Sequence, residues 1–307
     1  MGQINSNMIR PPYLETGDTV ILISTARKVS REEINPSIAI IESWGLKVQL
    51  GNHLFSEDNQ FAGTDKQRAV DLQFALDSDV IKAIICVRGG YGTVRIIDQI
   101  NFSNFVKKPK WLCGFSDVTV LHSMIHNIGI QSIHSTMPLL FPKDEQKDAV
   151  ESLRQALFGE MLHYQFPVNP MNKGVHMEGQ VIGGNLSIIN NLIGTSSDID
   201  TKDKILFLED LDEYLYHIDR MMVHLKRAGL LSGLSGLLIG HMSDMNDNTV
   251  PFGKSAYEII LDAVKEYKYP VFFDFPAGHL NNNYAIKLGS EVQLEQKSEI
   301  LEFTSLE

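Results

Sequence analysis

Short apolar runs alternate with amphipathic, helix-like patterns over the first half of the chain. Apolar runs of strand length lie at residues 19–24, 46–50, 81–87 and 111–113. Apolar residues with helical spacing lie at 34–44, 65–76, 94–97, 118–128 and 147–157. Continuously apolar strands that alternate with helices are typical of a parallel sheet covered on both faces. The pattern therefore predicts an N-terminal α/β domain with a parallel sheet over residues 1–160.

The second half of the chain has a different pattern, in which short strands predominate. Residues 166–174 contain two prolines, two asparagines and a glycine, so residues 161–175 are predicted to be a linker. A turn is expected at Gly183-Gly184, and further strands and helices at 205–208, 213–227, 237–239, 257–264 and 271–273. Short apolar segments at 285–288, 292–294 and 300–303 suggest antiparallel pairing. Residues 176–307 are thus predicted to form a β-rich α/β domain.

The composition is that of a globular protein, because 43% of the 307 residues are hydrophobic and 21% are charged. The formal net charge of −11 argues against binding to a phosphate backbone, so no nucleic-acid partner is expected. No apolar run approaches the roughly 18 residues that span a bilayer. We therefore expect no membrane partner.

Three features of the sequence concern the cellular location. Residues 1–18 are polar and lack the basic-then-apolar pattern of a signal peptide. Residues 1–6 match an N-myristoylation template, which short sequences often match by chance. The two cysteines, Cys86 and Cys113, each lie inside an apolar run, as buried thiols in a reducing compartment do. The expected location is the cytoplasm.

The segment with the clearest chemical pattern is residues 111–118. A hydrophobic strand runs through Gly114 into Ser116 and then into a helix. This is the arrangement of a nucleophile elbow, in which a sharp strand-to-helix turn presents a serine hydroxyl. The match to the G-x-S-x-G template is incomplete because Val118 stands at the second glycine. Spacing alone also allows Ser116 or Asp117 to be a simple cap of the helix, and both interpretations stay open.

A serine nucleophile needs a general base and an acid that orients it. Among the histidines, His241 and His279 each follow an apolar strand through a glycine, which suits a position in a cleft. Carboxylates gather after the strand at 205–208, where Glu209 and Glu213 are the candidate acids. An ordinary acidic cluster at a helix N-terminus would explain the same carboxylates, so the pattern does not choose between the two interpretations.

No metal or cofactor is expected. His122 and His126 lie four apart on a predicted helix, but the sequence places no acidic third ligand near them. The glycine-rich turn at residues 88–92 follows a strand, as a phosphate-binding turn does. However, Arg95 replaces the third glycine of the dinucleotide fingerprint, and the Gly-Lys-Ser pair of a P-loop is missing.

The same glycine-rich turn has a second interpretation, as part of an oxyanion hole. It ends a strand that is expected to lie beside the strand leading to Ser116, at the carboxyl edge of the parallel sheet. We expect the backbone N–H groups of Asp117 and Gly90 to hold an oxyanion, with Gly89 as the alternative to Gly90. Asp117 qualifies because it follows the nucleophile at the start of the helix, where backbone N–H groups are free.

Six segments, in this order, resemble the LD-carboxypeptidase (muramoyl-tetrapeptide carboxypeptidase) family and its relative, the microcin-C immunity peptidase. They are FAGTD at 61–65, RGGYG at 88–92, GFSD at 114–117, GGNLS at 183–187, LFLED at 206–210 and GH at 278–279. The resemblance extends over nearly the whole chain, from residue 17 to the last strands. One departure is Ser24-Thr25-Ala26, where the family often has Ala-Pro-Ser.

The resemblance implies that Ser116, Glu209 and His279 form a catalytic triad, with Glu213 as the alternative acid. It also implies that the N-terminal domain holds the nucleophile and the C-terminal domain holds the acid and the base. The site would then lie across the cleft between the two domains. Proteins of this family are often homodimers, so a homodimer is expected here.

The implied reaction is hydrolysis of the amide between an L-configured centre and the terminal D-alanine of a cytoplasmic peptidoglycan tetrapeptide. Two alternatives stay open: a microcin-C-like amidase that cleaves peptidyl-nucleotides, and a non-catalytic module that holds an anionic ligand at residues 89–92 and Ser116. The nucleotide-cleaving branch is expected to add aromatic surface that stacks on a base. The only tryptophans, Trp44 and Trp111, lie in core-like elements, which favours the muropeptide.

Overall fold

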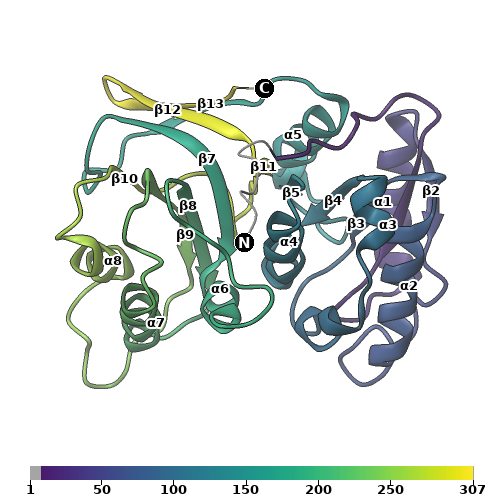
Figure 1. Cartoon of the computed structure of the whole chain (residues 1–307), viewed down its shortest axis with the longest axis horizontal. Coiled ribbons are helices and arrows are strands. Elements are labelled where there is room, and N and C mark those ends of the chain that lie inside the picture. The colour runs from purple at the N-terminus through teal and green to yellow at the C-terminus, as the bar shows by residue number, and fades with distance from the viewer. Residues whose placement is uncertain (1–7, 307) are drawn as a thin grey trace.

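The computed structural model describes residues 8–306 and arranges them around two sheets that lie side by side (Figure 1). The N-myristoylation template at residues 1–6 lies outside the described residues. The expected mixed α/β fold, with a parallel-sheet N-terminal half and a second β-rich sheet, is confirmed. No helix within residues 8–306 combines the length and the apolar character that crossing a membrane requires.

The first sheet has six strands in the order β11-β5-β4-β3-β1-β2. Five of them come from the N-terminal half and are parallel: β1 (Thr19–Ile23), β2 (Lys47–Leu50), β3 (Ile81–Cys86), β4 (Trp111–Gly114) and β5 (Ser132–His134). The sixth, β11 (Ile286–Leu288), comes from the C-terminal half and pairs antiparallel with β5. The helices of this half are α1 (Arg31–Ser43), α2 (Asp65–Asp77), α3 (Ser103–Lys107), α4 (Thr119–Asn127) and α5 (Lys147–Phe158).

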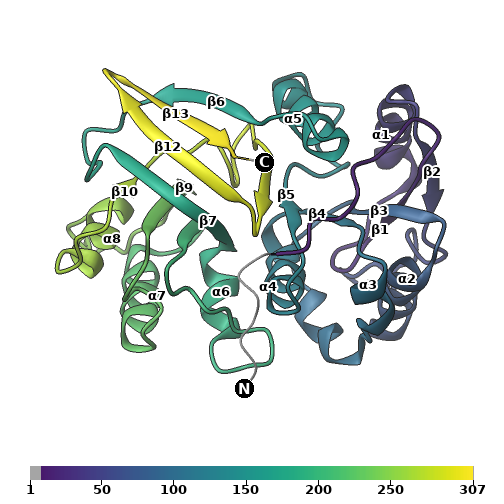
Figure 2. The same ribbon diagram turned by 45° about the horizontal axis from the view of Figure 1, so that its top comes forward.

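The second sheet has seven strands in the order β10-β9-β8-β7-β12-β13-β6. Its parallel part contains β7 (His176–Asn185), β8 (Ile205–Leu211), β9 (Gly236–Ser243) and β10 (Val271–Phe272). Its antiparallel part adds β12 (Glu291–Lys297), β13 (Ile300–Ser305) and β6 (His163–Pro167) beside β7, and Figure 2 shows β12 and β13 in yellow between the teal β7 and β6. The helices here are α6 (Leu186–Leu192), α7 (Leu215–Arg227) and α8 (Ala256–Val264).

Two segments have a structure other than the one that the sequence pattern predicts. The segment predicted as a linker contains β6, in which Tyr164 and Phe166 are buried while His163, Gln165 and Pro167 are exposed. Such alternation of buried and exposed residues is typical of a strand with one covered face. The prolines and asparagines of this segment led instead to the prediction of a linker. The chain therefore joins the second sheet at residue 163, and residues 168–175 connect β6 to β7. The helix expected at 94–97 is instead a pair of short 3₁₀ turns, Thr93–Arg95 and Ile97–Gln99.

The turn expected at Gly183-Gly184 is wrong, because both glycines lie near the end of strand β7, which continues directly into α6. Their φ angles are +125° and +145°, in the region that favours glycine. A Cβ on Gly183 would lie 1.9 Å from the carbonyl oxygen of Phe207, and one on Gly184 would lie 2.5 Å from Oγ1 of Thr119. The two glycines thus let β7 pass closely between β8 and helix α4.

This close passage holds the two halves of the molecule together. Helix α4 of the first half contacts both β7 and α6 of the second (Figure 1). One buried hydrophobic cluster also includes residues from both sheets, among them Trp111 of β4 and Phe207 of β8. Side chains that project from either half toward the boundary between them are therefore held on a continuous, packed support.

We expect Gly183→Ala to reduce the free energy of unfolding by at least about 3 kcal/mol, because its Cβ would overlap the backbone of β8. Gly194→Ala is the matched control, since Gly194 also has a positive φ, +80°, but nothing lies within 4 Å of the added Cβ. The control should lose only about 1 kcal/mol, the cost of a left-handed alanine. Thermal unfolding of both variants measures the difference, and equal losses would show that β7 has room at this position.

Candidate active site

Ser116 occupies a sharp turn between β4 and the helical segment that leads into α4. Its φ is +62°, a strained value for a residue with a side chain. Gly114 makes the turn possible, because a Cβ there would lie 2.9 Å from a methyl group of Val118. Neither Ser116 nor Asp117 caps the following helix with its side chain, which removes the capping interpretation of this segment. The turn has the geometry of a nucleophile elbow.

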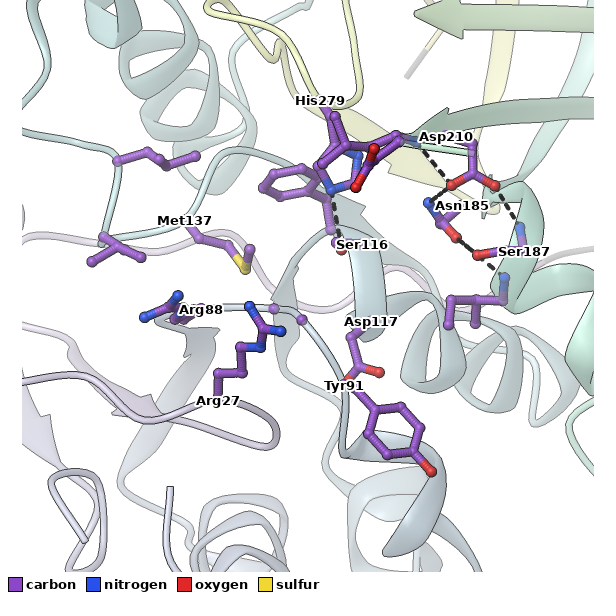
Figure 3. Close-up of a pocket in the computed structure, with 18 of the residues that line it drawn as sticks. Arg27, Arg88, Tyr91, Ser116, Asp117, Met137, Asn185, Ser187, Asp210 and His279 are labelled. Atoms are coloured by element: carbon purple, nitrogen blue, oxygen red, sulfur yellow. Dashed lines mark hydrogen bonds between the residues drawn. The ribbon is translucent and has the colours of Figure 1, made fainter. Parts of the chain in front are cut away.

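His279 lies against Ser116, although the two residues are far apart in the sequence. Its Nε2 is 3.2 Å from the Ser116 Oγ (Figure 3). Its Nδ1 is 2.7 Å from Oε2 of Glu209. The His279 backbone N–H also donates to Glu209 Oε2, at 3.3 Å. The ring of Phe115 packs against the imidazole with a centroid separation of 4.9 Å. The imidazole is thus fixed in position and in orientation between a hydroxyl and a carboxylate.

Glu209 lies fully buried on β8, where the pairing with β9 shifts register between Leu208 and Asp210. Such irregularities bend a strand and can direct a side chain toward a site. Gly278 permits the close approach of the His279 loop, because a Cβ on it would lie 2.8 Å from the Cβ of Glu209. Of the two candidate acids, Glu209 is the one that contacts His279. Glu213 instead contacts Nδ1 of His217 on α7.

The electrostatics of the histidine–glutamate pair favour its charged form. Burial alone would lower the pKa of His279, but the charge of Glu209 and its hydrogen bond outweigh burial and raise this pKa above its ordinary value near 6.5. Burial would likewise raise the pKa of Glu209, but His279 opposes it and the pKa of Glu209 is lowered. Glu209 therefore stays ionised and can stabilise a proton on His279.

The glycine-rich loop after β3 lies directly beside Ser116. A Cβ on Gly89 would lie 3.0 Å from the Cβ of Ser116, and one on Gly90 would lie 2.6 Å from Cδ of Arg27. Gly90 also has a φ of +110°, so glycine is required there on both counts. In the part of the chain that the structure describes, the backbone N–H groups of Gly90 and Asp117 donate to no protein acceptor. Both residues line the cavity at Ser116, so both N–H groups are available to a ligand.

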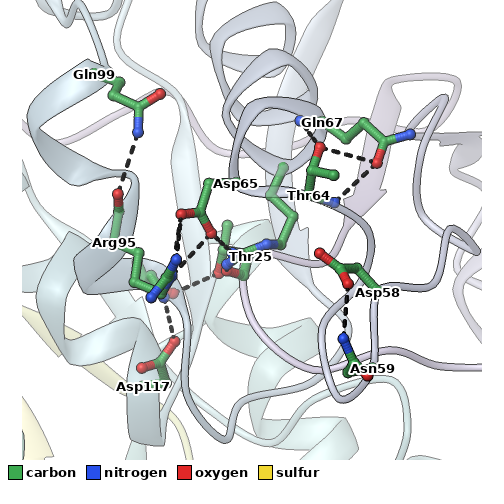
Figure 4. Close-up of polar contacts among 11 residues, drawn as sticks. Thr25, Asp58, Asn59, Thr64, Asp65, Gln67, Arg95, Gln99 and Asp117 are labelled. Atoms are coloured by element: carbon green, nitrogen blue, oxygen red, sulfur yellow. Dashed lines mark hydrogen bonds and ion pairs between the residues drawn. The ribbon is translucent and has the colours of Figure 1, made fainter.

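A polar network that could not be foreseen from the sequence supports this loop (Figure 4). The Thr93 backbone N–H donates to Asp117 Oδ2 at 2.9 Å, and the hydroxyls of Thr93 and Thr25 are 2.7 Å apart. Arg68, almost fully buried, donates to the Thr25 carbonyl at 2.7 Å and also contacts Asp65. The carboxyl of Asp117 thus anchors the loop while its backbone faces the cavity. Asp65, the last residue of the FAGTD segment, belongs to this network through its contact with Arg68.

Asp210, next to Glu209, has a structural environment of its own. Its buried carboxylate accepts from Nδ2 of Asn185 at 3.0 Å and from the Ser187 backbone N–H at 2.8 Å (Figure 3). Burial, with the neighbouring charge of Glu209, raises the pKa of Asp210 to about 7. The Asn185 backbone N–H in turn donates to Oγ1 of Thr119, at 3.0 Å. This chain of bonds links the acidic end of β8 to the helix that follows Ser116.

A cavity of about 550 Å³ opens over Ser116, which is large enough for a short peptide. Its walls differ in charge. Arg27 and Arg88 line it from the N-terminal half, and Asp210, Asp212 and Glu213 line it from the C-terminal half. The other candidate base, His241, is not among the residues that line this cavity.

The histidine pair considered as a metal site has another role. His122 is buried, and its two ring nitrogens lie 2.8 Å from the Ser132 hydroxyl and 2.9 Å from the Gly114 carbonyl oxygen. Burial lowers the pKa of His122 to about 3, so it stays neutral and braces the strand before the elbow. Among residues 8–306, no three His, Cys, Asp or Glu side chains gather where they could hold a metal ion. That the reaction needs no metal stays a prediction.

Comparison with known proteins confirms the resemblance drawn from the six segments. Residues 20–135 match the LD-carboxypeptidase N-terminal domain, and residues 178–294 match the LD-carboxypeptidase C-terminal domain. The probable murein peptide carboxypeptidase of Bacillus subtilis (strain 168) is 33% identical, over 95% of this chain and 94% of its own length.

Two solved structures share the fold of the chain. The muramoyltetrapeptide carboxypeptidase from Oxalobacter formigenes is 24% identical with a TM-score of 0.84, and the match covers 94% of this chain and 98% of that one. MccF in complex with glutamyl sulfamoyl guanosine is 18% identical with a TM-score of 0.86, and the match covers 96% of this chain and 98% of that one. At these identities the likeness shows the architecture alone.

We expect a fluorophosphonate to label Ser116 at a rate that falls as the pH drops through the raised pKa of His279, because only the neutral imidazole can accept the serine proton. The midpoint of the wild type should therefore lie above pH 6.5. Glu209→Gln should move the midpoint to lower pH, since it removes the charge that raises this pKa. It should also slow labelling on the order of 10³–10⁴-fold, because a glutamine amide favours the wrong imidazole tautomer.

Glu213→Gln is the matched control for this experiment, because it removes a carboxylate from the same wall that is paired with His217 instead. Its midpoint should stay at the wild-type value. Intact-protein mass spectrometry over a range of pH measures both the rate and its midpoint. A midpoint that moves in Glu213→Gln and not in Glu209→Gln would reverse the assignment of the acid.

Proposed function

The chain belongs to the LD-carboxypeptidase family, and we propose that it is a serine peptidase in which Ser116, His279 and Glu209 form the catalytic triad. We further propose that it releases the terminal D-alanine from cytoplasmic peptidoglycan tetrapeptides. The observation that carries the proposal is the series of contacts from a strained serine through a partly buried histidine to a fully buried carboxylate. A protein that only binds an anionic ligand does not need a serine, a histidine and a carboxylate in contact with one another.

The reaction would proceed through an acyl-enzyme. The Ser116 Oγ attacks the carbonyl carbon of the scissile amide while His279 Nε2 takes the hydroxyl proton, and Glu209 stabilises the resulting imidazolium. His279 then passes this proton to the nitrogen of the leaving D-alanine as the C–N bond breaks. Water, deprotonated by His279, attacks the ester and returns Ser116 to its starting form.

The tetrahedral intermediates carry a negative oxygen, which the backbone N–H groups of Gly90 and Asp117 would hold. Support for this role comes from their position beside Ser116 and from their lack of protein acceptors within residues 8–306. The glycine loop is braced through Thr93 and the carboxyl of Asp117, so these donors are fixed before substrate binds. Donors fixed in this way stabilise charge without reorganisation during the reaction.

Two findings favour a muropeptide over a peptidyl-nucleotide. Relatives of this chain bear the names probable murein peptide carboxypeptidase and murein tetrapeptide carboxypeptidase. The aromatic residues that line the cavity are Tyr91 and Phe115, and Phe115 already packs against His279. Trp44 and Trp111 lie away from the cavity, in contact with Phe141 and Tyr13. The peptidyl-nucleotide amidase remains the alternative, because MccF shares the fold.

A cytoplasmic location is part of the proposal. Cys86 and Cys113 are free and buried, which fits a compartment that keeps thiols reduced. The homodimer implied by the resemblance stays a prediction.

We expect the protein to release alanine from L-Ala-γ-D-Glu-meso-diaminopimelate-D-Ala and not from the same peptide ending in L-alanine. A site shaped for a D-residue would misplace the L-residue, and a misplacement of about 1 Å can cost on the order of 10² in rate. A pentapeptide ending in D-Ala-D-Ala should also resist cleavage, because its last bond joins two D-centres. Amino-acid analysis of the products measures all three rates, and Ser116→Ala is the inactive control.

Two results would contradict the substrate assignment. One is cleavage of the pentapeptide at the rate of the tetrapeptide. The other is rapid cleavage of an aminoacyl-adenylate mimic with no alanine released from the tetrapeptide, which would favour the amidase.

A further inference from the structure

Two guanidinium groups line the same cavity as Ser116 without a carboxylate partner among residues 8–306. Arg27 follows β1, and Arg88 follows β3. Within the described part of the chain, the one side-chain hydrogen bond of this pair runs from Nη1 of Arg88 to the Lys28 carbonyl oxygen, at 3.1 Å. Arg68, Arg95 and Arg154 differ from this pair, because each of them contacts a carboxylate. Unpaired cations in a pocket indicate an anionic ligand.

Both arginines contact or belong to the glycine-rich loop, in which the Gly90 N–H is a proposed oxyanion donor. The stem of Arg27 packs so closely on Gly90 that a Cβ there would lie 2.6 Å from the Arg27 Cδ. The Arg27 backbone N–H is 3.4 Å from the Gly89 carbonyl oxygen, so the two loops are joined. Figure 3 shows Arg27 and Arg88 on the side of the cavity opposite Asp210 and His279. Both cations thus share a rim with the place where the scissile carbonyl must lie.

Peptide geometry determines what an anion on this rim could be. In a substrate that loses its last residue, the terminal carboxylate carbon lies only about 3–4 Å from the scissile carbonyl carbon, across one nitrogen and one Cα. A group that recognises this carboxylate must therefore stand next to the oxyanion hole. A guanidinium suits this task because its planar N–H groups match the two oxygens of a carboxylate.

We propose that Arg27 and Arg88 bind the terminal carboxylate of the substrate and thereby restrict the peptidase to the last residue of the chain. This role rests on the proposed function. The wall of the cavity opposite the arginines supports this orientation of the substrate. The carboxylates of Asp212 and Glu213 would repel a substrate carboxylate placed there. A peptide therefore enters with its C-terminus toward the N-terminal half of the molecule.

The experiment compares two substrates that differ only in the charge of their end: the tetrapeptide acid and the same peptide ending in D-alaninamide. The wild type should cleave the acid about 100-fold faster in kcat/KM, the effect expected for hydrogen bonds to a charged group. Arg27→Met and Arg88→Met should each lose about 10-fold or more on the acid, chiefly through KM, and little on the amide. Methionine at position 27 keeps the stem that packs on Gly90, and Arg27→Lys should restore part of the preference.

Lys28→Met is the matched control, because it removes a neighbouring positive charge that pairs with Glu57 on the surface. This variant should keep the full preference for the acid. Equal losses on acid and amide in the arginine variants, or a wild type that cleaves both equally, would overturn the carboxylate role and leave the peptidase standing. A wild type that releases neither D-alanine from the acid nor D-alaninamide from the amide would overturn the proposed function, and the carboxylate role with it.

Discussion

The contact of the His279 ring with both Ser116 and Glu209 requires three distant segments of the chain to meet. It joins an elbow in the first sheet, a strand of the second sheet and a loop near the end of the chain. These three segments lie far apart in the sequence. Their alignment depends on the packing of β7 against α4, which the two glycines at the end of β7 permit. The proposed chemistry therefore depends on residues that touch no substrate.

The two adjacent carboxylates of β8 show how environment separates roles. Glu209 faces His279, and its pKa is lowered, so it is available as a permanent negative charge. Asp210 faces backbone and amide donors, and burial raises its pKa to about 7. Its bonds to Asn185 and Ser187 join β8 to the end of β7, where the Asn185 N–H donates to Thr119 of the first half. We therefore propose different roles for two neighbouring carboxyl groups: Glu209 acts in catalysis, and Asp210 holds the structure together.

Much of this arrangement could be predicted from the sequence, and the missing parts have identifiable causes. The strand–Gly–x–Ser–helix pattern located Ser116 because an elbow is a local structure. Spacing could not choose between Glu209 and Glu213, since both follow the same strand, and only the folded chain brings Glu209 to His279. The network under the glycine loop was not predictable, because it joins Thr25, Arg68 and Asp117 from segments far apart in the sequence.

The most direct test of the central claim is a crystal structure of the protein with a peptidyl boronate or phosphonate bound to Ser116. Such an adduct places an oxygen where the oxyanion of the intermediate would lie. We expect a covalent bond to Ser116 Oγ and an oxygen about 2.7–3.1 Å from the backbone nitrogens of both Gly90 and Asp117. Attachment to another residue, or an oxygen held by side chains with neither nitrogen in range, would contradict the central claim.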